Sequence, residues 1–162
     1  MLFLLSSFLC GCKDNKPIYV ISSSPQLQLP FKASKFFGFF DKHNLNLQLD
    51  SAPNSDSLLR FLNFSKYSVV ITDSGTAEKI EALSSKWVKI CTVALKKQKL
   101  HPIKKGNRKF ILLMKESLLS RKKEAIKVIE GWNYGVDLLK DPAVIRFFSA
   151  ETVPYRFLRC GK

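Results

Sequence analysis

The sequence has few of the side chains on which catalytic and metal sites are usually built. It contains two histidines, His43 and His101, and neither has a carboxylate or a cysteine at motif spacing nearby. A nucleophile–base pair needs such a partner, and a zinc site needs several cysteines or histidines at short intervals. The four cysteines show no such spacing either. We therefore expect no enzymatic activity, no catalytic residue, and no cofactor or metal.

Acidic residues are also scarce. Asp and Glu number 13 against 27 Lys and Arg, which gives a net charge of +14. Such a charge attracts polyanions, either nucleic acid or the headgroup surface of a membrane. The lysines are scattered, however, as on an ordinary solvated surface. The one dense basic run, residues 96–109, has none of the interleaved aromatic side chains that stack on bases, so nucleic acid is the least favoured partner and a solvated connection the simplest interpretation.

No apolar run approaches the ~20 residues needed to cross a bilayer as a helix. Residues 2–9 are nearly all apolar, as in the core of a signal peptide, and a polar run at 13–16 follows Leu9-Cys10-Gly11-Cys12. This pattern resembles the bacterial lipobox. The resemblance implies a lipoprotein signal peptide at 1–11, acylation at Cys12, a tether at 12–16, and a protein anchored on the periplasmic or extracytoplasmic face of a membrane. A buried N-terminal helix or strand is the alternative, because no basic residue precedes the apolar run.

The remaining two cysteines, Cys91 and Cys160, lie far apart in the sequence. An oxidising compartment would allow a disulfide between them. The sequence alone does not establish that pairing, and one buried thiol with one exposed thiol is the simpler interpretation.

Strand-like and helix-like patterns alternate over residues 17–150. Apolar or alternating runs predict strands at 17–21, 45–49, 67–72, 87–95 and 110–114. Helical spacing predicts helices at 29–44, 54–62, 77–83, 117–139 and 143–148, with Gly131 and Gly135 weakening the fourth. The alternation predicts one three-layer α/β domain, with helices on both faces of a mainly parallel five-stranded sheet that includes one antiparallel strand. Residues 151–162 form a tail without a clear pattern.

Polar turns follow the first three predicted strands. Because the carboxyl ends of parallel strands meet at one edge, where helix N-termini offer free N–H groups, we expect a ligand site there. The same residue types cap helices in most proteins, so capping alone is the alternative. The candidate ligand-binding residues are Ser22, Ser23, Ser24 and Pro25 in the first turn, Asn54 and Ser55 in the second, and Thr72, Asp73, Ser74 and Gly75 in the third.

Residues 18–25, 30–45, 54–72 and 110–142 resemble, in this order, four segments of ABC-transporter solute-binding proteins, the type II periplasmic binding proteins. The branch in question includes the thiamine-pyrimidine and aliphatic-sulfonate binding proteins. In the second segment the shared pattern is Gly38 followed by an aromatic residue. The Asp that usually begins the third strand is Tyr67 or Ser68 here.

The resemblance implies a single lobe of a fold that normally has two. Family members are about twice as long, with the second lobe inserted where this chain has only residues 96–109. The implied function is a solute-binding lipoprotein of an ABC-type transport system, with a small organic solute, the permease subunits and the membrane as partners, and with pairing to a second copy as an option. A structural or interaction lipoprotein that keeps the lobe as a scaffold is the alternative, and a basic nucleic-acid-binding protein is a third.

Overall fold

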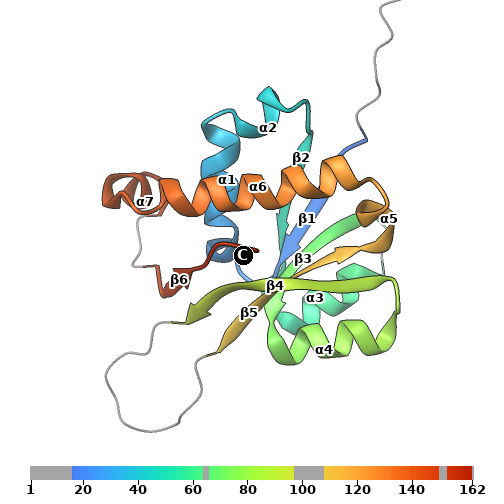
Figure 1. The fold of residues 1–162 in the computed structure, drawn as a ribbon. Helices are drawn as coiled ribbons and strands as arrows, with labels where there is room; N and C mark the ends of the chain where they lie inside the picture. The colour runs from blue at the N-terminus through green and yellow to red at the C-terminus, as the bar shows by residue number, and fades with distance from the viewer. Residues whose placement is uncertain (1–15, 64–65, 97–107, 150–152, 162) are drawn as a thin grey trace, which may run out of the picture.

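A mixed sheet of six strands in the order β2-β1-β3-β5-β4-β6 forms the centre of the protein (Figure 1). We describe it from a computed structural model covering residues 16–63, 66–96, 108–149 and 153–161. The strands are β1 (Ile18–Ser22), β2 (Leu47–Ser51), β3 (Tyr67–Asp73), β4 (Trp87–Lys96), β5 (Lys109–Lys115) and β6 (Tyr155–Phe157).

One of the five predicted strands, β5, is antiparallel as expected, but the sheet as a whole is mixed rather than mainly parallel. β1 pairs in parallel with β2 and β3, whereas β5 is antiparallel to both β3 and β4, so β4 runs in the same direction as the first three strands. The correction comes from the C-terminal tail, where β6 pairs antiparallel with β4 and adds a sixth strand. A three-residue strand is too short to show periodicity, and its pairing with β4 depends on tertiary contacts. Strand β2 lies at one edge of the sheet.

Helices cover both faces of the sheet, which confirms the three-layer α/β prediction. Figure 1 shows α1, α2, α6 and α7 on one side and α3 and α4 on the other. The helices are η1 (Pro25–Gln28, a 3-10 turn), α1 (Leu29–Phe36), α2 (Phe39–Lys42), α3 (Ser55–Leu62), α4 (Ser74–Leu83), α5 (Glu116–Leu119), α6 (Lys122–Leu138) and α7 (Pro142–Phe148).

Two of the predicted helices are each divided in two. The expected helix at 29–44 breaks at Gly38, whose φ of 73° lies in the left-handed region that glycine adopts without steric cost. The expected helix at 117–139 divides into α5 and α6 at Arg121, whose ψ of 63° is not helical.

Alternate residues of the strands form two separate cores. Ile18 and Val20 of β1 face the first group of helices and pack in a core with Phe31, Phe40 and Trp132. The neighbouring Ile21 faces the other way, into a second core with residues of α3 and α4 such as Leu58 and Ile80. This alternation is the period of two expected for a strand buried on both faces.

The glycines of α6 allow it to lie directly on α1 and α2. A Cβ atom at Gly135 would lie 1.9 Å from the carbonyl oxygen of Pro30, and one at Gly131 would lie 2.4 Å from the ring of Phe40. Ser34 of α1 also donates a hydrogen bond to the Gly131 carbonyl. The glycines that weaken the helical pattern are therefore required by close packing between helices.

Strands β4 and β5 form a hairpin whose hydrogen-bonded pairing continues to the end of β4 and the start of β5. The Lys96 N–H donates to the Arg108 carbonyl at 3.1 Å, and Leu95 is paired with Lys109. The predicted basic loop at 96–109 is therefore shorter than expected, and its central part, 97–107, lies outside the described residues. The predicted signal peptide and Cys12 lie outside them as well. Within the described ranges, no helix has the length and apolar character needed to cross a membrane.

Candidate functional site

The three polar turns lie together at the carboxyl ends of β1, β2 and β3. Ser22 at the end of β1 is paired with Ser51 on one side and Ile71 on the other. The turns are also joined through their backbones: the Ser23 N–H donates to the Ile71 carbonyl at 3.0 Å, and the Ala52 N–H donates to the Ser22 carbonyl at 2.8 Å. We call this edge, with its three turns, the polar rim.

The first turn contains the hydroxyl groups most available to a ligand. Ser22 is buried, and its Oγ donates to the Ser24 carbonyl at 2.6 Å, which holds the turn in shape. Ser23 and Ser24 are half-buried, and within the described part of the chain neither hydroxyl has a hydrogen-bond partner. Pro25 is exposed and begins the 3-10 turn.

The second turn begins α3. Asn54 is the N-cap, and its side-chain oxygen accepts a hydrogen bond from the Ser57 N–H at 2.8 Å, which is the capping role given as the alternative to ligand binding. Ser55 is half-buried, and its hydroxyl donates to Asp73 Oδ2 at 2.9 Å. Ser55 therefore links the second turn to the third.

The third turn is organised around the carboxylate of Asp73. Oδ1 accepts the Thr76 N–H at 3.0 Å, and Oδ2 accepts the Thr76 hydroxyl at 2.8 Å in addition to Ser55. Burial opposes ionisation, but these hydrogen bonds outweigh it and hold the pKa of Asp73 below its usual range. Thr72 before it is fully buried, whereas Ser74 is half-buried and Gly75 exposed. Asp73 is thus a charged N-cap of α4 whose oxygens are already engaged.

The polar rim offers mainly hydrogen-bond donors. Besides the hydroxyls of Ser23, Ser24 and Ser74, the first turn of α4 presents N–H groups that have no acceptor within the helix. One exposed basic residue, Lys109, lies near these donors. It precedes Phe110, which is paired with Asp73 across β3 and β5. The free donors favour a polar ligand that carries acceptor oxygens, whereas for negative charge the attraction of Lys109 is opposed by the ionised Asp73 at the same helix N-terminus.

A cavity that the sequence did not indicate lies at the other end of the sheet. Its volume is about 200 Å³, and it is enclosed by α3, α4 and the start of β4. Its lining includes Leu59, Leu62, Ile80 and Trp87, with Lys86 at its margin. These residues come from separate segments, so no local motif could have revealed the cavity.

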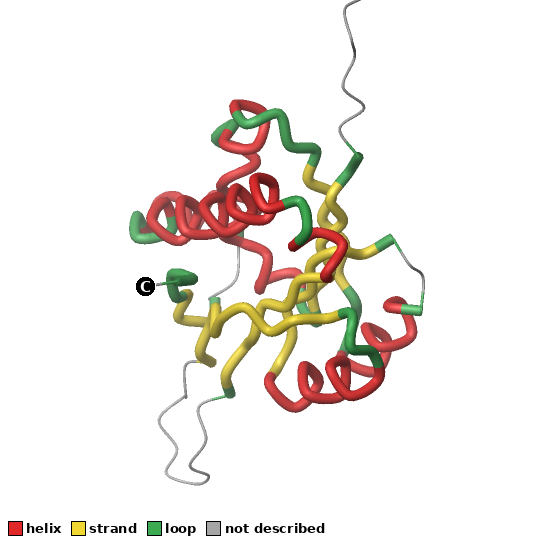
Figure 2. The backbone as a smooth tube through the Cα atoms, turned by 45° about the vertical axis from the view of Figure 1, so that its right-hand side comes forward, coloured by secondary structure: helices red, strands yellow, loops and turns green. Residues whose placement is uncertain are grey.

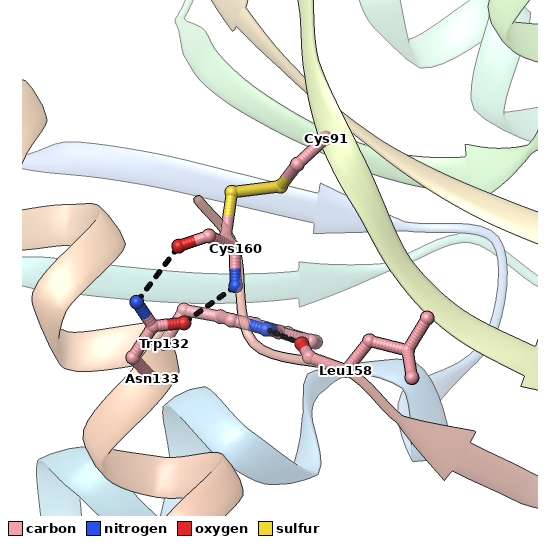
Figure 3. Close-up of a disulfide and its surroundings, with 5 residues drawn as sticks. All are labelled: Cys91, Trp132, Asn133, Leu158 and Cys160. Carbon is pink, nitrogen blue, oxygen red and sulfur yellow. Dashed lines mark hydrogen bonds between the residues drawn. A yellow bond between two sulfur atoms is a disulfide. The ribbon is translucent and has the colours of Figure 1, made fainter. Parts of the chain in front are cut away.

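Cys91 and Cys160 form a disulfide, which corrects the interpretation of two separate thiols (Figure 3). Their Cα atoms lie 5.6 Å apart although 69 positions separate them in the sequence. Helix α6 holds the same C-terminal segment: Trp132 Nε1 donates to the Leu158 carbonyl at 2.8 Å, and the side-chain amide of Asn133 exchanges two hydrogen bonds with the Cys160 backbone. We call the segment from β6 to Cys160, with these contacts, the C-terminal clamp.

His43 packs against an aromatic ring in the described part of the chain. The His43 ring packs 4.7 Å from that of Phe39, and His101 lies outside the described residues. Among the residues that are described, no group of three or more His, Cys, Asp and Glu side chains is arranged to hold a metal ion.

Comparison with known proteins shows the fold. No protein-family model and no curated protein sequence matches the chain. Among solved structures, the chain is similar to the Candida albicans CA3427 gene product, described as defining a new family of proteins that exhibits the generic periplasmic binding protein structural fold. The TM-score is 0.65, the sequence identity is 11%, and the match covers 87% of this chain and 81% of the other. The protein therefore has a periplasmic-binding-protein-like α/β fold.

Proposed function

We propose that this protein is the substrate-binding lipoprotein of an ABC-type transport system and holds a small organic solute at the polar rim. The observation that carries the proposal is the position of the three turns: they meet at one edge of a fold shared with periplasmic binding proteins. Ligands of open α/β sheets bind at this edge, outside the carboxyl ends of the strands.

The chemistry of the rim supports a solute with acceptor oxygens. The hydroxyls of Ser23 and Ser24, with the N–H groups that begin α4, donate to such a group, while Lys109 supplies positive charge beside it. A sulfonate has three acceptor oxygens and one negative charge, and a hydroxymethylpyrimidine has neutral acceptors. We infer that the solute belongs to one of these classes, and we assign no catalytic role to the rim.

A solute bound to a single lobe can be enclosed only if a second surface covers it. Strands β4 and β5 are joined through residues 97–107, where family members carry the second lobe. A second copy of this chain or a permease subunit could supply that surface, and we propose both as partners. A solute held by one lobe alone is expected to bind weakly, because it stays partly exposed to water.

Export to the cell envelope is part of the proposal. A structural disulfide such as Cys91–Cys160 persists in oxidising compartments and is rare in the cytosol. This supports the lipoprotein signal at residues 1–11 and the anchor at Cys12. Mass spectrometry of the full-length chain produced in an exporting bacterium tests the anchor: a mature N-terminus at acylated Cys12 is expected, and an unprocessed N-terminus would contradict it.

Solute binding is tested by thermal shift and calorimetry with two sulfonates, taurine and an alkanesulfonate, and with a hydroxymethylpyrimidine. We expect at least one of them to raise the melting temperature. The double variant Ser23→Ala/Ser24→Ala should weaken its binding about tenfold or more, because each lost hydrogen bond is worth about 1 kcal/mol. The matched control is Ser85→Ala, an exposed serine just beyond α4 at the opposite end of the sheet, which should bind as the native chain does.

The second candidate is a structural or interaction lipoprotein that keeps the lobe as a scaffold. The observation in its favour is that Asn54 and Asp73 already serve as helix caps, which leaves fewer polar groups for a solute. The absence of stabilisation by every solute, together with native behaviour of the Ser23/Ser24 variant, would favour this candidate over transport.

A further inference from the structure

Large aromatic side chains are exposed together at one corner of the protein. Phe36 and Phe37 end α1, and Phe147 and Phe148 end α7. Phe36 is 61% exposed, Phe37 48% and Phe147 66%. Their rings are in contact, with the Phe36 ring 5.4 Å from Phe37, 5.0 Å from Phe147 and 5.5 Å from Phe148. We call these four residues the phenylalanine patch. A contiguous exposed apolar surface of this kind marks an interaction site.

The two helices that carry the patch, together with the neighbouring α2, are basic. Helices α1, α2 and α7 contain four basic residues and one acidic residue, and the N-cap of α7 adds a second acidic residue. The surroundings of the patch are therefore positive, in keeping with the whole chain. The basic residues are Lys32, Lys35, Lys42 and Arg146, and the acidic residues are Asp41 and Asp141.

The α1 part of the patch lies near the end of the protein where the chain enters the sheet, whereas α7 lies at the left-hand margin of Figure 1. The Lys35 Nζ donates to the Leu47 carbonyl at 2.7 Å, which places the end of α1 beside the start of β2. The Ile18 N–H donates to the Asn46 carbonyl, so β1 starts at the same place. Figures 1 and 2 both show α2 and the start of β1 at this end, away from the carboxyl ends of β1 and β2.

The position of the proposed anchor limits how far this end can be from a membrane. Cys12 precedes Ile18, the first residue of β1, by six positions, and six extended residues span at most about 22 Å. If Cys12 carries the lipid, the start of β1 stays within that distance of the headgroups. The end of α1 that bears Phe36 and Phe37 then lies at the end of the protein nearest the membrane, and Phe147 joins it through its ring contact with Phe36.

We propose that the phenylalanine patch docks on an anionic lipid surface, with its rings in the interface and the neighbouring basic side chains among the headgroups. This inference rests on the anchor at Cys12 in the proposed function. Exposed aromatic rings enter the boundary between headgroups and acyl chains, and basic residues beside them are attracted by anionic lipid. The docked orientation directs the polar rim away from the membrane, because the rim lies at the opposite ends of the strands.

Tryptophan fluorescence on vesicles tests the orientation. A chain that begins at Cys12 contains every strand and helix described, and its Cys12 thiol can be coupled to a maleimide lipid while Cys91 and Cys160 remain in their disulfide. The native tryptophans, Trp87 and Trp132, are 8% and 0% exposed and give a constant background.

Brominated lipids should quench new tryptophans in Phe36→Trp and Phe147→Trp. The matched control is Phe61→Trp, at a position 38% exposed on α3 across the sheet, which should not be quenched. Quenching should be stronger in phosphatidylglycerol vesicles than in pure phosphatidylcholine. Equal quenching at all three positions, or none at Phe36 and Phe147, would overturn the proposal.

A second measurement separates lipid docking from self-association. The uncoupled chain should bind phosphatidylglycerol vesicles about tenfold or more less tightly when Phe36 and Phe147 are both changed to Ser, because two aromatic rings no longer leave water. If the same double variant instead converts a dimer to a monomer and leaves vesicle binding unchanged, the patch is an interface between copies and the proposal fails. The quenching and vesicle-binding measurements do not depend on acylation in cells. An unacylated Cys12 in cells would therefore contradict the proposed lipid anchor, and the two measurements would still show whether the patch binds lipid.

Discussion

The two halves of the sheet are stabilised by contacts of different range. At the polar rim, beside β1, β2 and β3, the capping hydrogen bonds join residues three positions apart, as from Asp73 to Thr76. At β4 and β6, the contacts that hold the C-terminal clamp join residues 26, 27 and 69 positions apart. The comparison teaches that short-range caps shape the individual turns of the rim, which sheet pairing and the Ser55–Asp73 bond bring together, whereas the contacts that hold the clamp join distant parts of the chain.

Removal of the disulfide should have the largest effect on this comparison. A cross-link that closes a loop of 69 positions stabilises the folded state by about 4 kcal/mol in the chain-entropy model. We expect the variant Cys91→Ser/Cys160→Ser to lose about that much free energy of unfolding in urea. The native chain should lose a similar amount when reductant is added.

Hydrogen exchange shows where the loss occurs. The amides of β6 should exchange faster in the double serine variant, while those of β1 and β3 should keep most of their protection, because the rim does not depend on the clamp. Equal acceleration in β1, β3 and β6 would mean that the two halves unfold as one unit, and the comparison would then be wrong.

The fold could be predicted from the sequence where the signals were local. The strand at 67–72 and its polar turn became β3 and the start of α4, and the helix predicted at 54–62 became α3, capped by Asn54. The clamp could not be predicted, since β6 has only three residues and pairs with β4 from the far end of the chain. The pairing of Cys91 with Cys160 likewise has no local signature.

The second largest effect is expected at the contact between α6 and α1. In Gly135→Ala the added Cβ would lie 1.9 Å from the Pro30 carbonyl oxygen, so the two helices must separate. We expect a loss of about 3 kcal/mol in the free energy of unfolding, measured by urea denaturation. The matched control is Gly75→Ala, where the nearest atom would be Asp73 Oδ1 at 3.5 Å, an ordinary contact. If both variants unfold alike, close helix packing does not explain Gly135.

The rim could be located from the sequence, but its internal bonding could not. Polar turns after successive strands predicted that their residues would share an edge. Nothing in the sequence indicated that Ser55 would donate to Asp73, because the two lie 18 positions apart, one at the start of α3 and the other at the N-cap of α4. This bond engages part of the carboxylate that the sequence offered as a ligand contact.

Replacement of Asp73 should have a smaller effect that depends on pH. The pKa of Asp73 is lowered in the folded state, so its carboxylate stabilises the protein above the pKa of the unfolded chain, near 4, and this contribution is lost as the pH falls through the folded value. We expect Asp73→Asn to lose about 2 kcal/mol at pH 7, because hydrogen bonds to a charged group are replaced by neutral ones.

Urea denaturation between pH 7 and pH 3 measures this dependence. The difference in stability between the native chain and Asp73→Asn should be constant above about pH 5 and should narrow below about pH 4. Ser55→Ala, which keeps the carboxylate and removes one donor, should lose less at pH 7 than Asp73→Asn does. A difference that stays constant down to pH 3 would show that the charge of Asp73 does not stabilise the rim.

The smallest effect should come from the most local contact, the cap of α3. Asn54→Ala removes the acceptor of the Ser57 N–H and should lower the free energy of unfolding by about 1 kcal/mol, whereas Asn54→Ser keeps an acceptor and should cost less. Because Asn54 is exposed and its bond spans three residues, the added hydrogen exchange should be confined to the first turn of α3. Faster exchange at β6 would contradict this expectation, since it would mean that a rim contact stabilises the clamp.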